Sequence, residues 1–110
     1  MKELIISKEL ISEVLNIPKE SIMDIYTDGN YLLIRKINSR VEEHNIYEFA
    51  FKCKEWARDK YDITISSSLY KNYAKSWNID KDKSYTAKTE VEVIIKACEF
   101  ILTKKESKWK

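Results

Sequence analysis

The chemically most versatile side chains of this 110-residue chain gather in one stretch, IYEFAFKCKEWARDKY at residues 46–61. This stretch holds aromatic rings, the thiol of Cys53, several carboxylates and several cations, and the single histidine, His44, stands just before it. Acid–base or nucleophilic catalysis would need a nucleophile and a base within hydrogen-bonding reach of each other. Whether the stretch offers such a site depends on which of its side chains share a face.

Helical periodicity separates these groups. At about 100° per residue, one stripe of the predicted helix collects Ile46, Phe49, Ala50, Cys53, Trp56, Ala57 and Lys60. The opposite side collects Glu48, Lys52, Glu55 and Asp59. Asn45 is a suitable N-cap, and Glu48 three positions later completes a capping-box pattern. The thiol and the carboxylates therefore point apart, which predicts a core helix rather than a catalytic one.

The two cysteines, Cys53 and Cys98, are 45 positions apart and each lies in a predicted helix. Neither belongs to a C-x-x-C pair, and His44 belongs to neither cysteine's segment. Buried reduced thiols that act as small hydrophobic groups are expected. The sequence predicts no cofactor and no metal site, and with one glycine in the chain it predicts no phosphate-binding loop and no enzyme activity.

A second long helix is predicted from Thr89 onward. Thr89 is its expected N-cap, with Glu92 three residues later. Its apolar residues cover more than half of the circumference, and only four residues form a polar strip: Glu92, Lys96, Glu99 and Thr103. A helix that is apolar on most sides must be buried on more than one of them. This helix is therefore expected to be the central element.

The remaining segments predict an α+β fold. Ser7 caps a short helix that Pro18 stops, and two strands follow around the turn signal Asp28-Gly29-Asn30. Residues 38–44 are polar and are expected to form a joint, whereas DITISSSL, YKNYAKSWNI and SYTA have the character of strands. We expect one domain, 1–110, in which an antiparallel sheet packs against two main helices. Its parts are an N-terminal helix and hairpin (1–44), a helix–strands–helix core (45–104) and a basic tail (105–110).

Composition and charge limit the partners. Hydrophobic residues make up 44% and charged residues 35% of the chain, the balance of a soluble globular protein. No apolar run is long enough to span a membrane, and the N-terminus does not resemble a signal peptide, so a cytoplasmic protein without a membrane partner is expected. The net charge of +2 divides into about −2 over residues 1–44 and about +4 over residues 45–110. The lysine-rich tail is interpreted as a solvated end, with weak attraction for nucleic acid as the alternative.

Three groups of residues are candidates for binding a partner. Lys71, Tyr73, Lys75 and Trp77 alternate along one predicted strand, as in a platform on which single-stranded nucleic acid stacks, although this face could also pack beneath the helices. Tyr47 and Phe51 form a second, narrower apolar strip, which either the N-terminal hairpin or a partner would cover. Trp109 lies in the basic tail. Helix faces that serve a core could equally serve a homodimer.

From residue 45 onward, the order helix, two or three strands, helix resembles the double-stranded-RNA-binding domain. In that family a lysine cluster at the start of the final helix grips phosphates across the major groove. The corresponding place here holds Thr89, Glu90, Val91 and Glu92, and two acids at this position would repel phosphate. The resemblance implies the fold, while binding of double-stranded or single-stranded nucleic acid is the alternative function.

A second resemblance covers residues 45–102. The segments NIYEFAFKCKEWA and AKTEVEVIIKACEFIL are similar to those of a group of small phage and prophage proteins that share an NIYE-A-KCKEWA helix and a closing TE-EAI-KAC-WI helix. This resemblance implies a host–virus context. It implies a non-enzymatic inhibitor that blocks a host macromolecule, with a protein of a bacterial defence system as the expected partner, in the manner of anti-CRISPR proteins.

Overall fold

The computed structural model describes the backbone of residues 6–69, 74–78 and 83–108. The chain divides into two compact units, Met1–Phe49 and Ala50–Lys110, and the boundary falls within one long helix. Both combine helices with antiparallel strands, which confirms the expected α+β class.

The first unit begins with a short capped helix. Helix α1 spans Lys8–Leu15, and the side chain of Ser7 accepts a hydrogen bond from the backbone nitrogen of Leu10 at 3.1 Å, as predicted. The helix ends at Asn16, whose left-handed conformation closes its C-terminus. Pro18 then precedes a single 3₁₀ turn, η1, at Lys19–Ser21. Local sequence signals therefore set both ends of α1.

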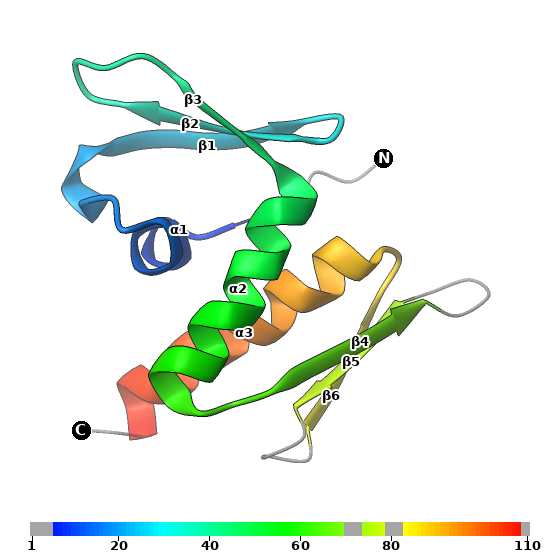
Figure 1. Cartoon of the computed structure of the whole chain (residues 1–110). Coiled ribbons are helices and arrows are strands. Elements are labelled where there is room, and N and C mark those ends of the chain that lie inside the picture. The colour runs from blue at the N-terminus through cyan, green and yellow to red at the C-terminus, as the bar shows by residue number, and fades with distance from the viewer. Residues whose placement is uncertain (1–5, 70–73, 79–82, 109–110) are drawn as a thin grey trace. The chain divides into compact units, whose positions relative to one another are not determined.

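Three antiparallel strands follow in the order β1-β2-β3: β1 at Ile22–Asp28, β2 at Tyr31–Lys36 and β3 at Glu42–Asn45 (Figure 1). The predicted turn joins β1 to β2, with Gly29 at a φ of 63° that favours glycine. Strand β3 corrects the expectation of a polar joint over residues 38–44. Its four residues pair with β2 from Ile34↔Glu42 to Tyr31↔Asn45, so the hairpin is extended to a three-stranded sheet.

The two faces of this first sheet differ in burial. Leu32 and Ile34 of β2 are completely buried, as are Leu10 and Ile11 of α1, and α1 lies on one side of the sheet in Figure 1. Alternate residues face the other way: Tyr26 and Tyr31 are exposed, and so are the charged residues beside them. The sheet therefore has one face toward a core and one toward solvent, as antiparallel sheets commonly do.

Helix α2 spans Ile46–Tyr61 and crosses from the first unit into the second. The Oδ1 atom of Asn45 accepts hydrogen bonds from the backbone nitrogens of Tyr47 at 2.9 Å and Glu48 at 3.2 Å, which confirms the predicted N-cap. The helix ends at Tyr61, where Asp62 adopts a left-handed conformation.

The second unit contains a three-stranded sheet in the order β4-β5-β6, all antiparallel: β4 at Ile65–Leu69, β5 at Ala74–Asn78 and β6 at Lys83–Ala87. Helix α3, Glu90–Lys108, follows, and the hydroxyl of Thr89 caps it by accepting from the backbone nitrogen of Glu92 at 3.1 Å. These elements confirm the helix–strands–helix order predicted from residue 45 onward.

Helix α3 lies at the centre of the second unit. It contacts β4, β5 and β6, and its Cys98 thiol lies 3.5 Å from the backbone oxygen of Cys53 in α2. Val93, Ile95, Ala97 and Cys98 are all but completely buried. Burial on both the sheet side and the α2 side explains why so few positions of this helix are polar, and it confirms the expectation of a central element.

Candidate functional site

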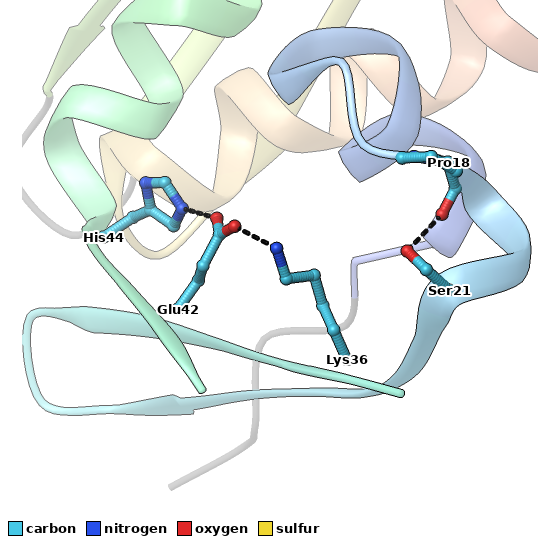
Figure 2. A network of polar contacts seen from close by, with 5 residues as sticks. All are labelled: Pro18, Ser21, Lys36, Glu42 and His44. Carbon is cyan, nitrogen blue, oxygen red and sulfur yellow. Dashed lines mark hydrogen bonds and ion pairs between the residues drawn. The ribbon is translucent and has the colours of Figure 1, made fainter. Parts of the chain in front are cut away.

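A network of three polar side chains occupies the edge of the first sheet. Nζ of Lys36 donates to Oε2 of Glu42 at 2.5 Å, and Oε1 of the same carboxylate lies 2.8 Å from Nε2 of His44 (Figure 2). Lys36 ends β2, while Glu42 and His44 lie two residues apart on β3 and so share a face. One carboxylate thus bridges an ammonium group and an imidazole.

The strand register places this network on the core-facing side of the sheet. Glu42 stands opposite Ile34, and His44 stands opposite Leu32, both of which are completely buried. The network side chains are themselves only partly covered, with 22–35% of their surfaces exposed. They therefore form the polar margin of an apolar face.

The electrostatics of the network favour the ionised carboxylate. The hydrogen bond from Lys36, and next the one with His44, hold the pKa of Glu42 below its usual value of 4.5, although partial burial acts in the opposite direction. A carboxylate fixed between two cationic or polar donors holds both strands in register. The arrangement is suited to pinning β3 to β2.

We expect the Glu42→Gln substitution to lower the free energy of unfolding by no more than about 1 kcal/mol at pH 7. The effect is small because the Lys36–Glu42 ion pair is partly exposed and screened by solvent. The folded state lowers the pKa of Glu42, so its contribution is present above the unfolded-state pKa and is lost as the pH falls through the folded-state pKa. The difference between wild type and variant should therefore shrink below about pH 4.5 in urea titrations. Glu43→Gln, on the opposite face of β3, is the control; an equal effect of both substitutions would contradict the assigned role.

The sequence contained a signal for this network that the prediction of a joint overlooked. In the segment VEEHN, Glu42 and His44 alternate with Glu43 and Asn45, which is the periodicity of a strand with two different faces. The segment lacks the branched and aromatic residues that usually mark a strand. The backbone pairing with β2 and the ion pair between Glu42 and Lys36 stabilise this strand although its residues have low strand propensity.

The strip Tyr47 and Phe51 is exposed. These side chains lie one turn apart on α2 and keep 59% and 61% of their surfaces accessible, respectively. The hydroxyl of Tyr47 donates a hydrogen bond to Oδ1 of Asn30 at 3.5 Å. The expectation that the N-terminal hairpin covers the strip, and the alternative that a partner covers it, stay predictions.

The other candidate binding residues are only partly located. Lys71, Tyr73 and Trp109 lie outside the described residues. Lys75 and Trp77 belong to β5, where Lys75 is paired with Ser68 and Thr86, and Trp77 with Ser66 and Ser84. The predicted strand character of this segment is confirmed over Ala74–Asn78, and its role in binding remains a prediction.

Both thiols are buried, as predicted. Cys53 and Cys98 are free cysteines with no exposed surface. Burial raises the pKa of the Cys53 thiol well above its usual range, and the hydrogen bond with Cys98 raises it further. On the opposite side of α2, Glu48, Lys52 and Asp59 are exposed. The Cys53 thiol is therefore protonated and lies on the buried side of α2, opposite these charges.

Within residues 6–69, 74–78 and 83–108, no group of three or more His, Cys, Asp and Glu side chains is arranged to hold a metal ion. Among the helices in that part of the chain, none has the length and apolarity needed to cross a bilayer.

No family model, curated protein or solved structure matches the chain significantly.

Proposed function

We propose that this chain is a non-enzymatic binding module that acts by occupying the surface of a macromolecular partner. The observation that carries the proposal is the exposure of Tyr47 and Phe51, one turn apart on α2. Aromatic residues are enriched at the centres of protein interfaces, where their burial contributes much of the binding energy. Because the exposed aromatic strip lies on a regular helix, little backbone conformational entropy is lost when these residues bind a partner.

The resemblance to small phage and prophage proteins supports a more specific form of the proposal. In that form the partner is a host protein in the bacterial cytoplasm, with a defence-system protein as the first candidate, and the chain acts as an anti-CRISPR-like inhibitor. Blocking a surface requires affinity and shape but no reactive group. The burial of both thiols is compatible with this mode of action.

Nucleic-acid binding is the second candidate, because α2, β4, β5, β6 and α3 follow one another in the order of the double-stranded-RNA-binding domain. The start of α3 argues against it. Glu90 and Glu92 occupy the first turn, and the carboxylate of Glu90 accepts a hydrogen bond from the hydroxyl of Ser67 at 2.7 Å. Two carboxylates suit a helix N-terminus but repel phosphate. The binding of a protein is therefore the preferred function.

The test is affinity capture from a bacterial host lysate treated with nuclease, using the wild-type chain and the Tyr47→Ser/Phe51→Ser variant. We expect one host protein to co-purify stoichiometrically with the wild type, and its recovery to fall about tenfold or more with the variant, because two aromatic contacts are lost. The melting temperature should change little, since both side chains are exposed.

The matched control is Lys52→Ser/Glu55→Ser, which places the same two serines on α2 and so imposes a similar cost in helix propensity. This control should retain the partner. Recovery of nucleic acid alone, association of the chain only with itself, or undiminished capture by the Tyr47/Phe51 variant would each overturn the proposal.

A further inference from the structure

The solvent-facing side of the first sheet has a composition that folding of the unit does not explain. We name it the acidic tyrosine face and define it by the alternate residues of the three strands that share it: Asp24, Tyr26, Asp28, Tyr31, Leu33, Arg35 and Glu43. All of these residues belong to the first compact unit. The face contains neither Tyr47 nor Phe51.

The centre of this face is apolar and aromatic. Tyr26 stands directly opposite Leu33 on the neighbouring strand, and Leu33 lies two residues from Tyr31 along β2. Tyr26 and Tyr31 keep 40% and 49% of their surfaces exposed, although the wet face of an antiparallel sheet is usually polar. Contiguous apolar side chains rimmed by polar ones mark interaction surfaces.

The rim of the face is negative. It carries three carboxylates and one guanidinium, and that guanidinium is already engaged, because Nη2 of Arg35 lies 3.2 Å from Oδ2 of Asp24 on the opposite strand. Asp28 and Glu43 are exposed, and neither forms an ion pair with another of the described residues. Two uncompensated carboxylates therefore flank the tyrosine rings.

We propose that the acidic tyrosine face binds an arginine-bearing segment of a partner protein. A guanidinium group stacks on the open face of a tyrosine ring and can pair in a bidentate manner with a carboxylate, so arginine satisfies both features of this surface at once. Lysine, a compact and strongly hydrated charge, satisfies them less well.

Charge excludes two other occupants. A nucleic acid would bring phosphates against Asp28 and Glu43 and be repelled. A second copy of the chain docked face to face would bring the same carboxylates together across a two-fold axis. The net charge of the whole chain is +2, so the overall charge does not attract a cationic segment. The attraction has to come from the carboxylates of this face.

The test is a titration of the ¹⁵N-labelled full chain with a nona-arginine peptide in low salt, followed by amide chemical shifts. We expect saturable shifts centred on β1, β2 and β3, and weaker binding of a nona-lysine peptide. In the Asp28→Asn/Glu43→Gln variant the dissociation constant for nona-arginine should rise about tenfold, because two charge-assisted contacts are lost. The Tyr26→Thr/Tyr31→Thr variant, which keeps strand propensity, should show a similar loss.

The matched control is Glu20→Gln/Asp62→Asn, which removes two exposed acidic charges elsewhere and should change the dissociation constant less than about twofold. The inference is overturned by shifts centred outside β1–β3, by equal losses in the control and in Asp28→Asn/Glu43→Gln, or by the absence of saturable binding up to about 1 mM peptide. It is also overturned if a single-stranded 20-mer DNA saturates this face or if the chain dimerises through it. These outcomes leave the test of Tyr47 and Phe51 unaffected, so the two proposals can fail separately.

Discussion

Replacement of Ile95 by alanine is expected to lower the free energy of unfolding of the second unit by about 2–5 kcal/mol. Ile95 lies in α3 with 1% of its surface exposed, and Val93, Ala97 and Cys98 of the same helix are also buried. The variant loses the transfer free energy of the removed methyl and methylene groups, and it also leaves a cavity that close-packed neighbours fill only in part. An effect of this size approaches the whole stability of a small domain.

A urea titration followed by tryptophan fluorescence measures this effect in the correct part of the chain, because Trp56, Trp77 and Trp109 all belong to the second unit. Thr103→Ala is the control on the same helix, since Thr103 is exposed and should change the free energy of unfolding by less than about 0.5 kcal/mol. Similar midpoints for Ile95→Ala and wild type would show that α3 is not the packed centre of its unit.

The two native thiols are expected to react with an aromatic disulfide reagent at least about a hundredfold more slowly in the folded chain than in urea. Cys53 and Cys98 have no exposed surface, and burial holds the pKa of Cys53 above its usual range, so little thiolate is present or accessible. Reaction requires α2 and α3 to separate locally, and the free energy of that opening sets the rate.

A third thiol serves as an internal reference in the same experiment. The Thr103→Cys variant adds an exposed cysteine to α3, and we expect one fast thiol and two slow thiols per chain. A fast phase in the wild-type chain would place a native sulfur near the surface. Reactive-cysteine chemistry would then have to be reconsidered for this protein.

Local signals in the sequence were sufficient to predict the helices. Ser7, Asn45 and Thr89 each cap a helix through the side-chain oxygen that the sequence pattern assigned to them. Capping depends on residues within three positions of each other, so a single sequence contains the necessary information. The burial of both cysteines was predictable for a similar reason, because helical periodicity places each of them on an apolar side.

Features that depend on contacts between distant residues were predicted less well. Strand β3 was missed because its residues, EEHN, have little strand propensity, and its pairing with β2 and the bridge from Lys36 to Glu42 become visible only once the strands are adjacent. The exposure of Tyr47 and Phe51 could not be predicted either, because it depends on whether another element covers this flank of the helix. Helical periodicity gives the direction of a side chain but not the position of other elements.

The candidate binding residues also differ in whether they depend on local sequence or on contacts between distant residues. The sequence identified Tyr47 and Phe51 as a strip, and each of the two side chains is exposed. The acidic tyrosine face was not identified, because Tyr26, Asp28, Tyr31 and Glu43 come from three strands and gather only through their register. The platform of Lys71, Tyr73, Lys75 and Trp77 remains a prediction from alternation along one strand.

The inward-pointing charges of β3 also bear on how the folded chain resists aggregation. An edge strand exposes unpaired backbone groups that can recruit a strand from another molecule. Any strand added beside β3 would have to cover Glu42 and His44, which point toward the core side and are only partly shielded. That desolvation would be costly, and β3 offers only four residues of pairing in return. The addition of strands from other molecules at the β3 edge of the sheet is therefore energetically unfavourable.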